Sequence, residues 1–520
     1  MAELHHECGI CGLYLLPGDE PVRLPAGVVH DDVAPLIPRM LLDLQNRGQL
    51  AAGMTGYDPK RDNLLATYRD LGPVDQAFRT ANPEKNAKIL KSVAGRAAIG
   101  HVRYATCGPD NRQYAQPFER PHGVKWKWFA FSFNGQLANY PLLRDELESH
   151  GFHLVRATDT EVIMHHLSYE LRGGDRVPIE EVFRSLAGRF DGAYNLLYLD
   201  AAGEMVALRD PLGIRPLCWG RIGRLVGFAS ESAALLNLGF REIESVPPGE
   251  MIVVTPAGIR RARIAPPADT AHCFFEWIYF ANAASELDER SVYQVRRNLG
   301  IELARTEAIR FDPSDSIVVP VPDTSKAAAD AMAFALGLPS MEGLLRNRYV
   351  GRTFIEAANR EEKVRRKFTP VRQVLEGKRV VLVEDSIVRS TTLMGLVTLL
   401  KTVGGAKEIH VRVACPPIVA PCFYGIDMSR LKELFARRYM TAPWTLTDEV
   451  QAKMAGELGA DSLRYLPVDS LARAMDLPPE RLCRACVTGD YPTPEGRRLY
   501  QLQLAHPDNG TRAYEAAQAR

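Results

Sequence analysis

Cys8 is the residue whose type and position most directly suggest chemistry. It follows a leader, residues 1–7, and opens the run Cys8-Gly9-Ile10-Cys11-Gly12. If the leader is removed, the first residue carries both a nucleophilic thiol and a free α-amine, whose pKa of roughly 7.7 to 8.0 suits a general base near neutral pH. Taken alone, the residue fits better as a small buried cysteine near a first strand. The clusters that follow favour catalysis.

The first half of the chain holds four polar positions that suit amide hydrolysis at such a thiol. Arg47 and Arg103 each carry a guanidinium fork, which can hold a carboxylate through two hydrogen bonds. Asn134-Gly135 ends a strand-like run, so a side-chain amide and a backbone N–H could point at a developing oxyanion. Asp159 stands at a predicted helix start, where it either caps the helix or binds a substrate ammonium. Arg103 could equally be structural.

Together these positions carry a resemblance to the N-terminal-nucleophile glutamine amidotransferases. The motifs are Glu7-Cys8-Gly9, Gln45-Asn46-Arg47-Gly48-Gln49, His101-Val102-Arg103-Tyr104-Ala105-Thr106, Asn134-Gly135, Asp159-Thr160-Glu161 and Arg209-Asp210-Pro211-Leu212-Gly213. The resemblance implies a four-layer αββα domain, a glutaminase reaction and self-cleavage of the leader before the nucleophile. It also implies residue roles: Cys8 as nucleophile, Asn134 and Gly135 as oxyanion hole, and Arg103 and Asp159 as ligands of the glutamine charges, to which we add Arg47.

A second polar cluster follows an apolar strand run, residues 380–383. Glu384-Asp385 leads into Ser386-Ile387-Val388-Arg389-Ser390-Thr391-Thr392 and then a helix. Backbone N–H groups in such a loop and at the helix start can form an anion nest for a phosphate. Adjacent carboxylates can bind ribose hydroxyls or Mg²⁺, which prefers oxygen ligands. The alternative is a capped helix after a core strand with two solvated acids.

This second run resembles the phosphoribosyltransferase signature. Two further segments resemble the glutamine phosphoribosylpyrophosphate amidotransferases, the iron–sulfur branch with a propeptide: Arg346-Asn347-Arg348-Tyr349-Val350-Gly351-Arg352, a mobile-loop motif, and Pro320-Val321-Pro322-Asp323-Thr324-Ser325. The resemblance implies that phosphoribosyl pyrophosphate is bound by Glu384, Asp385, Ser386, Arg389, Ser390, Thr391, Thr392, Arg346, Tyr349 and Arg352, and Mg²⁺ by Thr324, Glu384 and Asp385. The basic residues after the loop could instead be an exposed helix face.

Four of the nine cysteines form a further candidate site. Cys483-Arg484-Ala485-Cys486 is a CxxC pair, which alone suggests metal or redox use weakly. The resemblance adds Cys273 and Cys422 and implies a [4Fe–4S] cluster with a structural role, although four thiolates suit zinc equally well on chemical grounds. We interpret Cys11, Cys107, Cys218 and Cys415 as small buried hydrophobic residues.

The elements that must position these residues divide into two domains. The chain has 520 residues, of which 46% are hydrophobic, and a net charge of +1. This charge gives no reason to expect binding to nucleic acid or to an anionic membrane surface. No signal peptide or membrane span is recognisable, so we expect a cytoplasmic protein. We predict a propeptide at 1–7, an α+β glutaminase domain at 8–255, a Pro-containing linker at 256–272, an α/β phosphoribosyltransferase domain with a parallel sheet at 273–492, and a polar tail at 493–520.

The function implied by the resemblance is amidophosphoribosyl transfer. Glutamine, phosphoribosyl pyrophosphate and water would give 5-phosphoribosylamine, glutamate and pyrophosphate, the first step of purine biosynthesis. The resemblance also implies inhibition by purine nucleotides and a dimer or tetramer. Two departures leave an alternative open: Ser390 and Pro320 stand where the family usually has glycine. The alternative is a divergent paralogue with glutaminase activity and a second domain that senses phosphoribosyl compounds or nucleotides.

Overall fold

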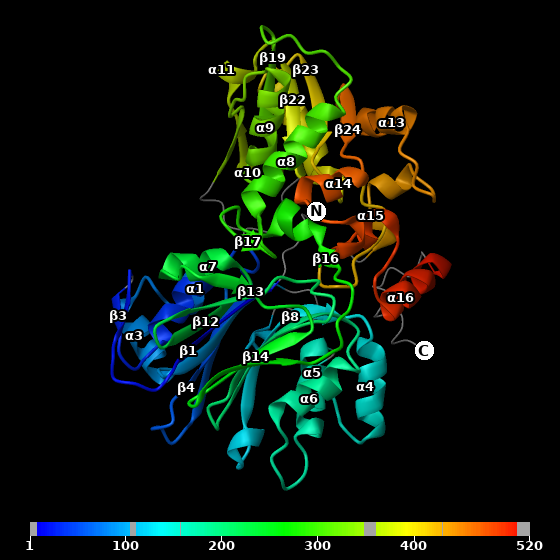
Figure 1. Cartoon of the computed structure of the whole chain (residues 1–520). Coiled ribbons are helices and arrows are strands. Elements are labelled where there is room, and N and C mark those ends of the chain that lie inside the picture. Colours follow the sequence, from blue (N-terminus) through cyan, green and yellow to red (C-terminus); the bar gives the residue numbers. More distant parts are fainter. Residues whose placement is uncertain are drawn as a thin grey trace.

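The computed structural model describes residues 8–25, 27–104, 111–156, 158–347, 360–428 and 430–506. Two bodies stand one above the other, the first domain below and the second above (Figure 1). The predicted leader, two of the predicted phosphate-binding residues (Tyr349 and Arg352) and Cys107 lie outside the described residues.

The first domain is built on two antiparallel sheets. The seven-stranded sheet has the order β13-β11-β12-β1-β6-β4-β5. Its strands are β1 (Gly9–Leu15), β4 (Ala51–Tyr57), β5 (Leu65–Leu71), β6 (Ala97–Arg103), β11 (Cys218–Ile222), β12 (Leu225–Ala229) and β13 (Ile243–Ser245). The six-stranded sheet has the order β15-β14-β10-β9-β8-β7. Its strands are β7 (Phe118–Arg120), β8 (Phe129–Leu137), β9 (Gly192–Asp200), β10 (Met205–Arg209), β14 (Glu250–Thr255) and β15 (Gly258–Arg263).

The two sheets pack face to face between two layers of helices. Strand β1 is buried along its whole length because its two faces contribute to different cores. Ile10 and Tyr14 pack with Leu197 and Ile252 of the other sheet, whereas Leu13 faces the outer core. That outer core holds α1 (Ile37–Asp43) and α7 (Ser232–Leu238), and the opposite one holds α4 (Tyr140–Ser149), α5 (Asp159–Glu170) and α6 (Ile179–Ala187) (Figure 1). This confirms the predicted αββα domain.

The second domain contains the predicted parallel sheet. Its order is β19-β22-β23-β24, and every neighbouring pair is parallel. The strands are β19 (Ser316–Pro320), β22 (Arg379–Glu384), β23 (Glu408–Val413) and β24 (Ser462–Tyr465), and the main helices around them are α8 (Val292–Arg305), α9 (Lys326–Leu336), α12 (Thr391–Thr402), α13 (Asp448–Leu458) and α14 (Asp469–Met475). The carboxyl ends of β19 and β22 therefore lie at one edge, where ligands bind in such sheets.

The connection between the domains differs from the prediction. Residues 258–263 of the predicted linker form β15, which pairs with β14 along its length, so the first domain extends to Arg263. The chain then enters β16 (His272–Cys273), which pairs in parallel with β25 (Leu482–Cys483). Part of the predicted tail forms a helix, α16 (Pro494–Ala505), whose Glu495 N–H donates to Asp191 Oδ2 of the first domain at 3.1 Å. Among the described residues, no helix is long and apolar enough to cross a membrane.

Candidate functional site: two cavities and a cysteine cluster

The first cavity brings together four of the residues predicted for the glutaminase reaction. It is lined by Cys8, Arg103, Tyr104, Tyr114, Gln116, Phe118, Phe133, Gly135, Thr158, Asp159 and Thr160. Cys8 directly precedes β1, and Gly9 pairs with Val102 at the end of β6, so the thiol lies beside the Arg103 end of that strand. The Cys8 Sγ donates to the backbone oxygen of Tyr104 at 3.6 Å.

Arg103 is held in the wall of this cavity by its own strand and by a glycine. Its guanidinium carbon lies 5.6 Å from the centroid of the Tyr114 ring, a cation–π contact. Gly48 packs against the Arg103 backbone so closely that a Cβ there would lie 2.5 Å from the Arg103 carbonyl carbon. The segment around Gly48 therefore needs glycine and fixes the position of Arg103.

Asp159 occupies the first residue of α5, and the residue before it caps the helix. The Thr158 hydroxyl accepts from Glu161 N at 3.3 Å, so the cap is Thr158 and the Asp159 carboxylate is available to the cavity. Asp159 Oδ1 also accepts from Thr160 N at 2.8 Å. Burial raises the pKa of Asp159 to about 6, and the hydrogen bond from Thr160 N acts in the opposite direction. A bound ammonium would favour the ionised form.

The two predicted oxyanion residues lie near the end of β8, but they differ in setting. Gly135 lines the first cavity, has a φ of +150°, and lies so close to β9 that a Cβ would be 2.0 Å from the Ala193 oxygen. Asn134 is buried, and its Nδ2 donates to Ser230 Oγ at 3.5 Å. In the described part of the chain, only Gly135 of this pair belongs to the cavity lining.

Arg47, predicted to bind glutamine, is a buried structural cation instead. Its Nε donates to Glu231 Oε1 at 2.6 Å, and its Nη2 to Glu276 Oε2 at 2.7 Å, with all three side chains at most 1% exposed. Arg47 does not belong to the described lining of the first cavity. Its guanidinium is already held by two carboxylates, so the prediction for Arg47 is wrong.

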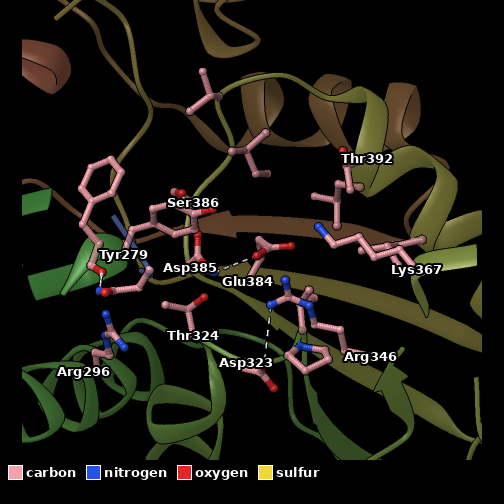
Figure 2. Close-up of a pocket in the computed structure, with 18 of the residues that line it drawn as sticks. Tyr279, Arg296, Asp323, Thr324, Arg346, Lys367, Glu384, Asp385, Ser386 and Thr392 are labelled. Carbon is pink, nitrogen blue, oxygen red and sulfur yellow. Dashed lines mark hydrogen bonds and ion pairs between the residues drawn. The ribbon is translucent and has the colours of Figure 1, made fainter. Parts of the chain in front are cut away.

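The second cavity has a volume of about 540 Å³ and opens at the carboxyl ends of β19 and β22. The predicted residues Thr324, Arg346, Glu384, Asp385, Ser386, Arg389 and Thr392 all line it. In Figure 2, Thr324, Glu384 and Asp385 lie near the centre, with Arg346 and Lys367 on one side and Arg296 on the other. The acids predicted to bind ribose or Mg²⁺ thus lie between cationic groups.

Hydrogen bonds within the loop hold the two carboxylates. Ser386 Oγ donates to Asp385 Oδ1 at 2.7 Å, and the Asp385 N–H donates to Glu384 Oε1 at 3.1 Å. Burial raises the pKa of Asp385 to about 6, while hydrogen bonds from Ser386 and Thr324 favour its ionised form. Arg296 is also buried, and burial lowers its pKa to about 10. A buried carboxylate near a buried guanidinium is a site prepared for a charged ligand.

Two of the cationic side chains of this cavity, Arg346 and Arg389, have acidic partners. Arg346 Nη1 lies 3.3 Å from Asp323 Oδ2, and Arg389 Nε donates to Glu433 Oε2 at 3.0 Å. The Arg346–Asp323 pair is partly exposed, so an anionic ligand can replace its carboxylate at little cost.

Ser390 and Thr391 differ from the prediction because their side chains do not belong to the described cavity lining. Ser390 Oγ accepts from Arg438 Nη2 at 3.2 Å and lies 3.4 Å from Glu457 Oε1, and Thr391 is the first residue of α12. The Ser390 backbone has φ −70° and ψ −18°, a conformation open to any residue. Serine therefore causes no backbone strain in this loop.

Sequence reasoning missed several lining residues. Arg296 and Tyr279 were not singled out, Lys367 was seen only as part of a basic run, and Asn46 and Gln49 were placed at the other site. Arg296 had a usable signal: it shares a face of α8 with Val292, Val295, Leu299 and Leu303, where an arginine must find a buried partner. Its Nε donates to the Trp277 oxygen and its Nη2 to the Ala281 oxygen, each at 2.8 Å.

The four predicted cluster cysteines line one apolar cavity between the domains. Cys273, Cys422, Cys483 and Cys486 meet there with Ile214, Arg215, Pro421, Tyr424, Ile426 and Ala485. Burial raises the pKa of Cys483 to about 12, so this thiol is protonated when no metal is bound. Within the described ranges, no three His, Cys, Asp or Glu side chains are placed to hold a metal ion.

Comparisons with known proteins agree with this two-site architecture. Residues 101–237 match the glutamine amidotransferase domain family. The chain is 39% identical to amidophosphoribosyltransferase of Methanothermobacter thermautotrophicus over 95% of this chain and 96% of that protein, and 36% identical to the Bacillus subtilis enzyme over 94% and 95%. A solved structure of glutamine phosphoribosylpyrophosphate amidotransferase from B. subtilis, complexed with ADP and GMP, matches with a TM-score of 0.79, 35% identity, and coverage of 94% of this chain and 97% of that one.

The fold and the two cavities define a glutamine amidotransferase whose second domain is a phosphoribosyltransferase. The extent and identity of the matches place the chain in a particular group within that class. The chain belongs to the amidophosphoribosyltransferase family. It is therefore an enzyme that transfers the amide nitrogen of glutamine to phosphoribosyl pyrophosphate, the first step of purine biosynthesis.

Proposed function

We propose that glutamine is hydrolysed in the first cavity, with Cys8 as nucleophile. Once the leader is removed, the Cys8 amine takes the thiol proton and the sulfur attacks the side-chain amide carbon. The amine then passes that proton to the amide nitrogen, the C–N bond breaks and ammonia leaves, and water hydrolyses the thioester to glutamate. Arg103 binds the substrate carboxylate, Asp159 its ammonium, and the Gly135 N–H the oxyanion. The observation that supports this is the presence of these four residues in one cavity.

Phosphoribosyl pyrophosphate fits the second cavity by charge and position. Glu384 and Asp385 accept hydrogen bonds from the ribose hydroxyls, and the loop from Ser386 to Thr392 offers N–H groups to the 5-phosphate. Arg346 and Lys367, together with Arg389, stabilise the pyrophosphate as it leaves. Tyr349 and Arg352 belong to the same proposal by resemblance. Ammonia attacks C1 of the ribose and pyrophosphate departs.

Mg²⁺ suits the same cavity because the donor set is oxygen. Thr324, Glu384 and Asp385 would hold the ion together with oxygens of the substrate phosphates, the usual mode for Mg²⁺. When bound, the ion supplies charge neutralisation for the pyrophosphate. The residues themselves act by fixing the ribose, since Asp385 is locked by Ser386.

One short segment, residues 45–49, contacts residues of both cavities. Gly48 packs against Arg103 of the first cavity, while Asn46 and Gln49 line the second. This proximity supports internal transfer of ammonia. Transfer inside the protein matters because ammonia released to neutral water is protonated and loses its nucleophilic electron pair.

The cysteine cavity fits a [4Fe–4S] cluster by the chemistry of its donors. Four cysteines around an apolar cavity supply the thiolates that such a cluster requires. Cys273 and Cys483 face each other in the β16–β25 pair, so a cluster would hold the C-terminal segment against the domain. Iron and sulfide analysis with a visible spectrum tests this; a colourless protein with stoichiometric zinc would refute it.

Purine nucleotides are proposed as inhibitors, because the B. subtilis relative was solved with ADP and GMP bound. Inhibition of synthesis by these two nucleotides, measured at fixed phosphoribosyl pyrophosphate, tests the proposal. We also propose that the protein forms a homodimer or homotetramer, which sedimentation would check, and that it is located in the cytoplasm.

The residue assignments are tested by pyrophosphate release with glutamine or ammonia as the nitrogen donor. Cys8→Ala should abolish the glutamine-dependent reaction and keep the ammonia-dependent one. Cys11→Ala is the matched control, because that neighbouring thiol is buried in β1 and burial raises its pKa. An intact mass lacking residues 1–7 should accompany activity. Glutamine hydrolysis without pyrophosphate release under any condition would contradict the assignment of the second cavity.

A further inference from the structure

Strand β8, which carries Gly135, is contacted near its end by a loop from the other domain. Gly425 follows Cys422 in the second half of the chain, yet its backbone lies against Gly135 of β8. A Cβ on Gly425 would lie 3.3 Å from the Gly135 carbonyl carbon and 3.4 Å from its oxygen. The backbone of Gly425 has a φ of +107°, which favours glycine at that position as well. The residue that lines the first cavity is thus packed between Ala193 on one side and Gly425 on the other.

One buried arginine holds this loop in place. Arg215 donates from Nε at 3.1 Å and from Nη2 at 2.6 Å to the same acceptor, the backbone oxygen of Tyr424. Its Nη1 lies 3.4 Å from Glu276 Oε1. A guanidinium fork usually engages a carboxylate with its two parallel N–H groups, but here the fork engages a neutral carbonyl and the carboxylate is the more distant partner. Arg215 is fully buried, so this arrangement carries a desolvation cost.

The arginine is itself fixed through the buried charges between the domains. Glu276 accepts from Arg215 and from Arg47, and Arg47 also pairs with Glu231. The aliphatic part of Arg47 touches the nucleophile's neighbour: a Cβ on Gly9 would lie 3.3 Å from Arg47 Cδ. The same set of buried charges therefore supports both the nucleophile end of β1 and, through Tyr424 and Gly425, the oxyanion end of β8.

We propose that Arg215 is a positioning residue for the glutaminase reaction, acting through residues 424–425 to set the Gly135 backbone; this rests on the proposed role of Gly135 as oxyanion donor. An oxyanion donor acts only when its N–H lies about 2.7 to 3.1 Å from the developing charge, so a shift of a few tenths of an ångström weakens it. The loop that makes this contact comes from the second domain. Correct docking of that domain is consequently a condition for amide hydrolysis.

Gly425→Ala tests the contact directly. The new Cβ must push the Gly135 peptide back, and glutaminase kcat should fall on the order of 100-fold, as for loss of one oxyanion donor. The KM for glutamine should change less than about threefold, because Arg103 and Asp159 are untouched. Gly173→Ala is the matched control: its φ of +100° is close to the +107° of Gly425, and nothing lies within 4 Å of its Cβ position. It should leave kcat unchanged.

Arg215→Lys supplies a second, milder perturbation. Lysine keeps the charge but cannot reproduce the two hydrogen bonds that the guanidinium directs at the one Tyr424 oxygen, so kcat should fall by a smaller factor, about tenfold. Ammonia-dependent synthesis is measured for every variant, because it uses the second cavity alone. It should stay within about twofold of the parent value, which a general loss of folding would not allow.

A transition-state mimic distinguishes positioning from binding. The γ-semialdehyde of glutamate adds the Cys8 thiol across its C=O bond, giving a hemithioacetal whose oxygen occupies the oxyanion position. Its affinity should weaken in Gly425→Ala by the same factor as kcat, whereas glutamate affinity should not change. Glutaminase kcat within threefold of the parent in both variants would overturn the proposal. So would a parallel loss of glutamine- and ammonia-dependent synthesis.

Discussion

Replacement of Arg47 by methionine separates the two roles that this residue can be given. Methionine keeps much of the volume but removes the charge, so Glu231 and Glu276 lose their shared cation. Breaking a buried ion pair from one side generally costs about 3 to 5 kcal/mol. If Arg47 instead bound the glutamine carboxylate, the main effect would be on substrate affinity.

The contacts that remain set the expected magnitude. Glu276 keeps Arg215 at 3.4 Å, and Glu231 keeps three donors: Asn46 Nδ2 at 2.8 Å, Asn282 N at 2.7 Å and Ser285 Oγ at 3.0 Å. Because neither carboxylate is left without a partner, we expect a loss near the lower limit, about 3 kcal/mol. For a domain of this size, that corresponds to a decrease of roughly 6 to 12 °C in the melting temperature of the first domain.

Differential scanning calorimetry measures this shift, and steady-state kinetics measure the KM for glutamine on the same samples. Arg23→Met is the control, because Arg23 is an exposed arginine on a short strand, β2 (Val22–Leu24), and should leave the melting temperature unchanged. A KM for glutamine raised more than tenfold, with an unchanged melting temperature, would show that Arg47 binds substrate and would refute the structural assignment.

Three other predictions follow from the two cavities. Because burial raises the pKa of Asp159 to about 6 and only the ionised form binds an ammonium, the KM for glutamine should rise about tenfold between pH 7 and pH 5, and Asp159→Asn should remove this dependence. Ser390→Gly should change the KM for phosphoribosyl pyrophosphate less than about twofold, since the serine backbone is unstrained; a tenfold improvement would contradict this. Lys367→Met should raise that KM at least tenfold, whereas Arg372→Met, at an exposed arginine outside the cavity, should not.

The candidate site positions could be predicted because each stands at or near the end of a recognisable strand. Cys8 precedes an apolar strand, Gly135 lies near the end of another, and Glu384 and Asp385 follow a third. Local pattern therefore places each residue at or near a strand end. The fold brings Cys8 and Gly135 together in the first cavity and keeps Glu384 and Asp385 in the second.

The partners of buried charges could not be predicted in this way. Arg47 and its carboxylates are 184 and 229 residues apart in sequence, and no local pattern connects them. An arginine in a glycine-containing loop looks the same whether it faces a substrate or a buried glutamate. For Asp159, the sequence left capping and substrate binding open; in the structure the cap is Thr158, and Asp159 lines the cavity.

The predicted linker was too long for a different physical reason. Strand β15 has the sequence Gly-Ile-Arg-Arg-Ala-Arg and lies at the sheet edge, with three of its residues exposed. Edge strands often carry charged residues, so this one lacks the apolar alternation by which strands are recognised. The flanking prolines, Pro256 and Pro266, then suggested a single connecting segment.

The five residues Gln45–Gln49 have a consequence for how members of this family can be recombined. Neighbouring residues in this stretch contact different parts of the molecule. Asn46 and Gln49 line the second cavity, Arg47 pairs with acids of both domains, and Gly48 packs against Arg103 of the first cavity. A chimera that joins the front lobe of one relative to the rear lobe of another must therefore carry this pentapeptide and its acidic counterparts as a matched block. If these residues come from different relatives, both domains of the chimera should fold, but ammonia released in the first domain should no longer reach the second.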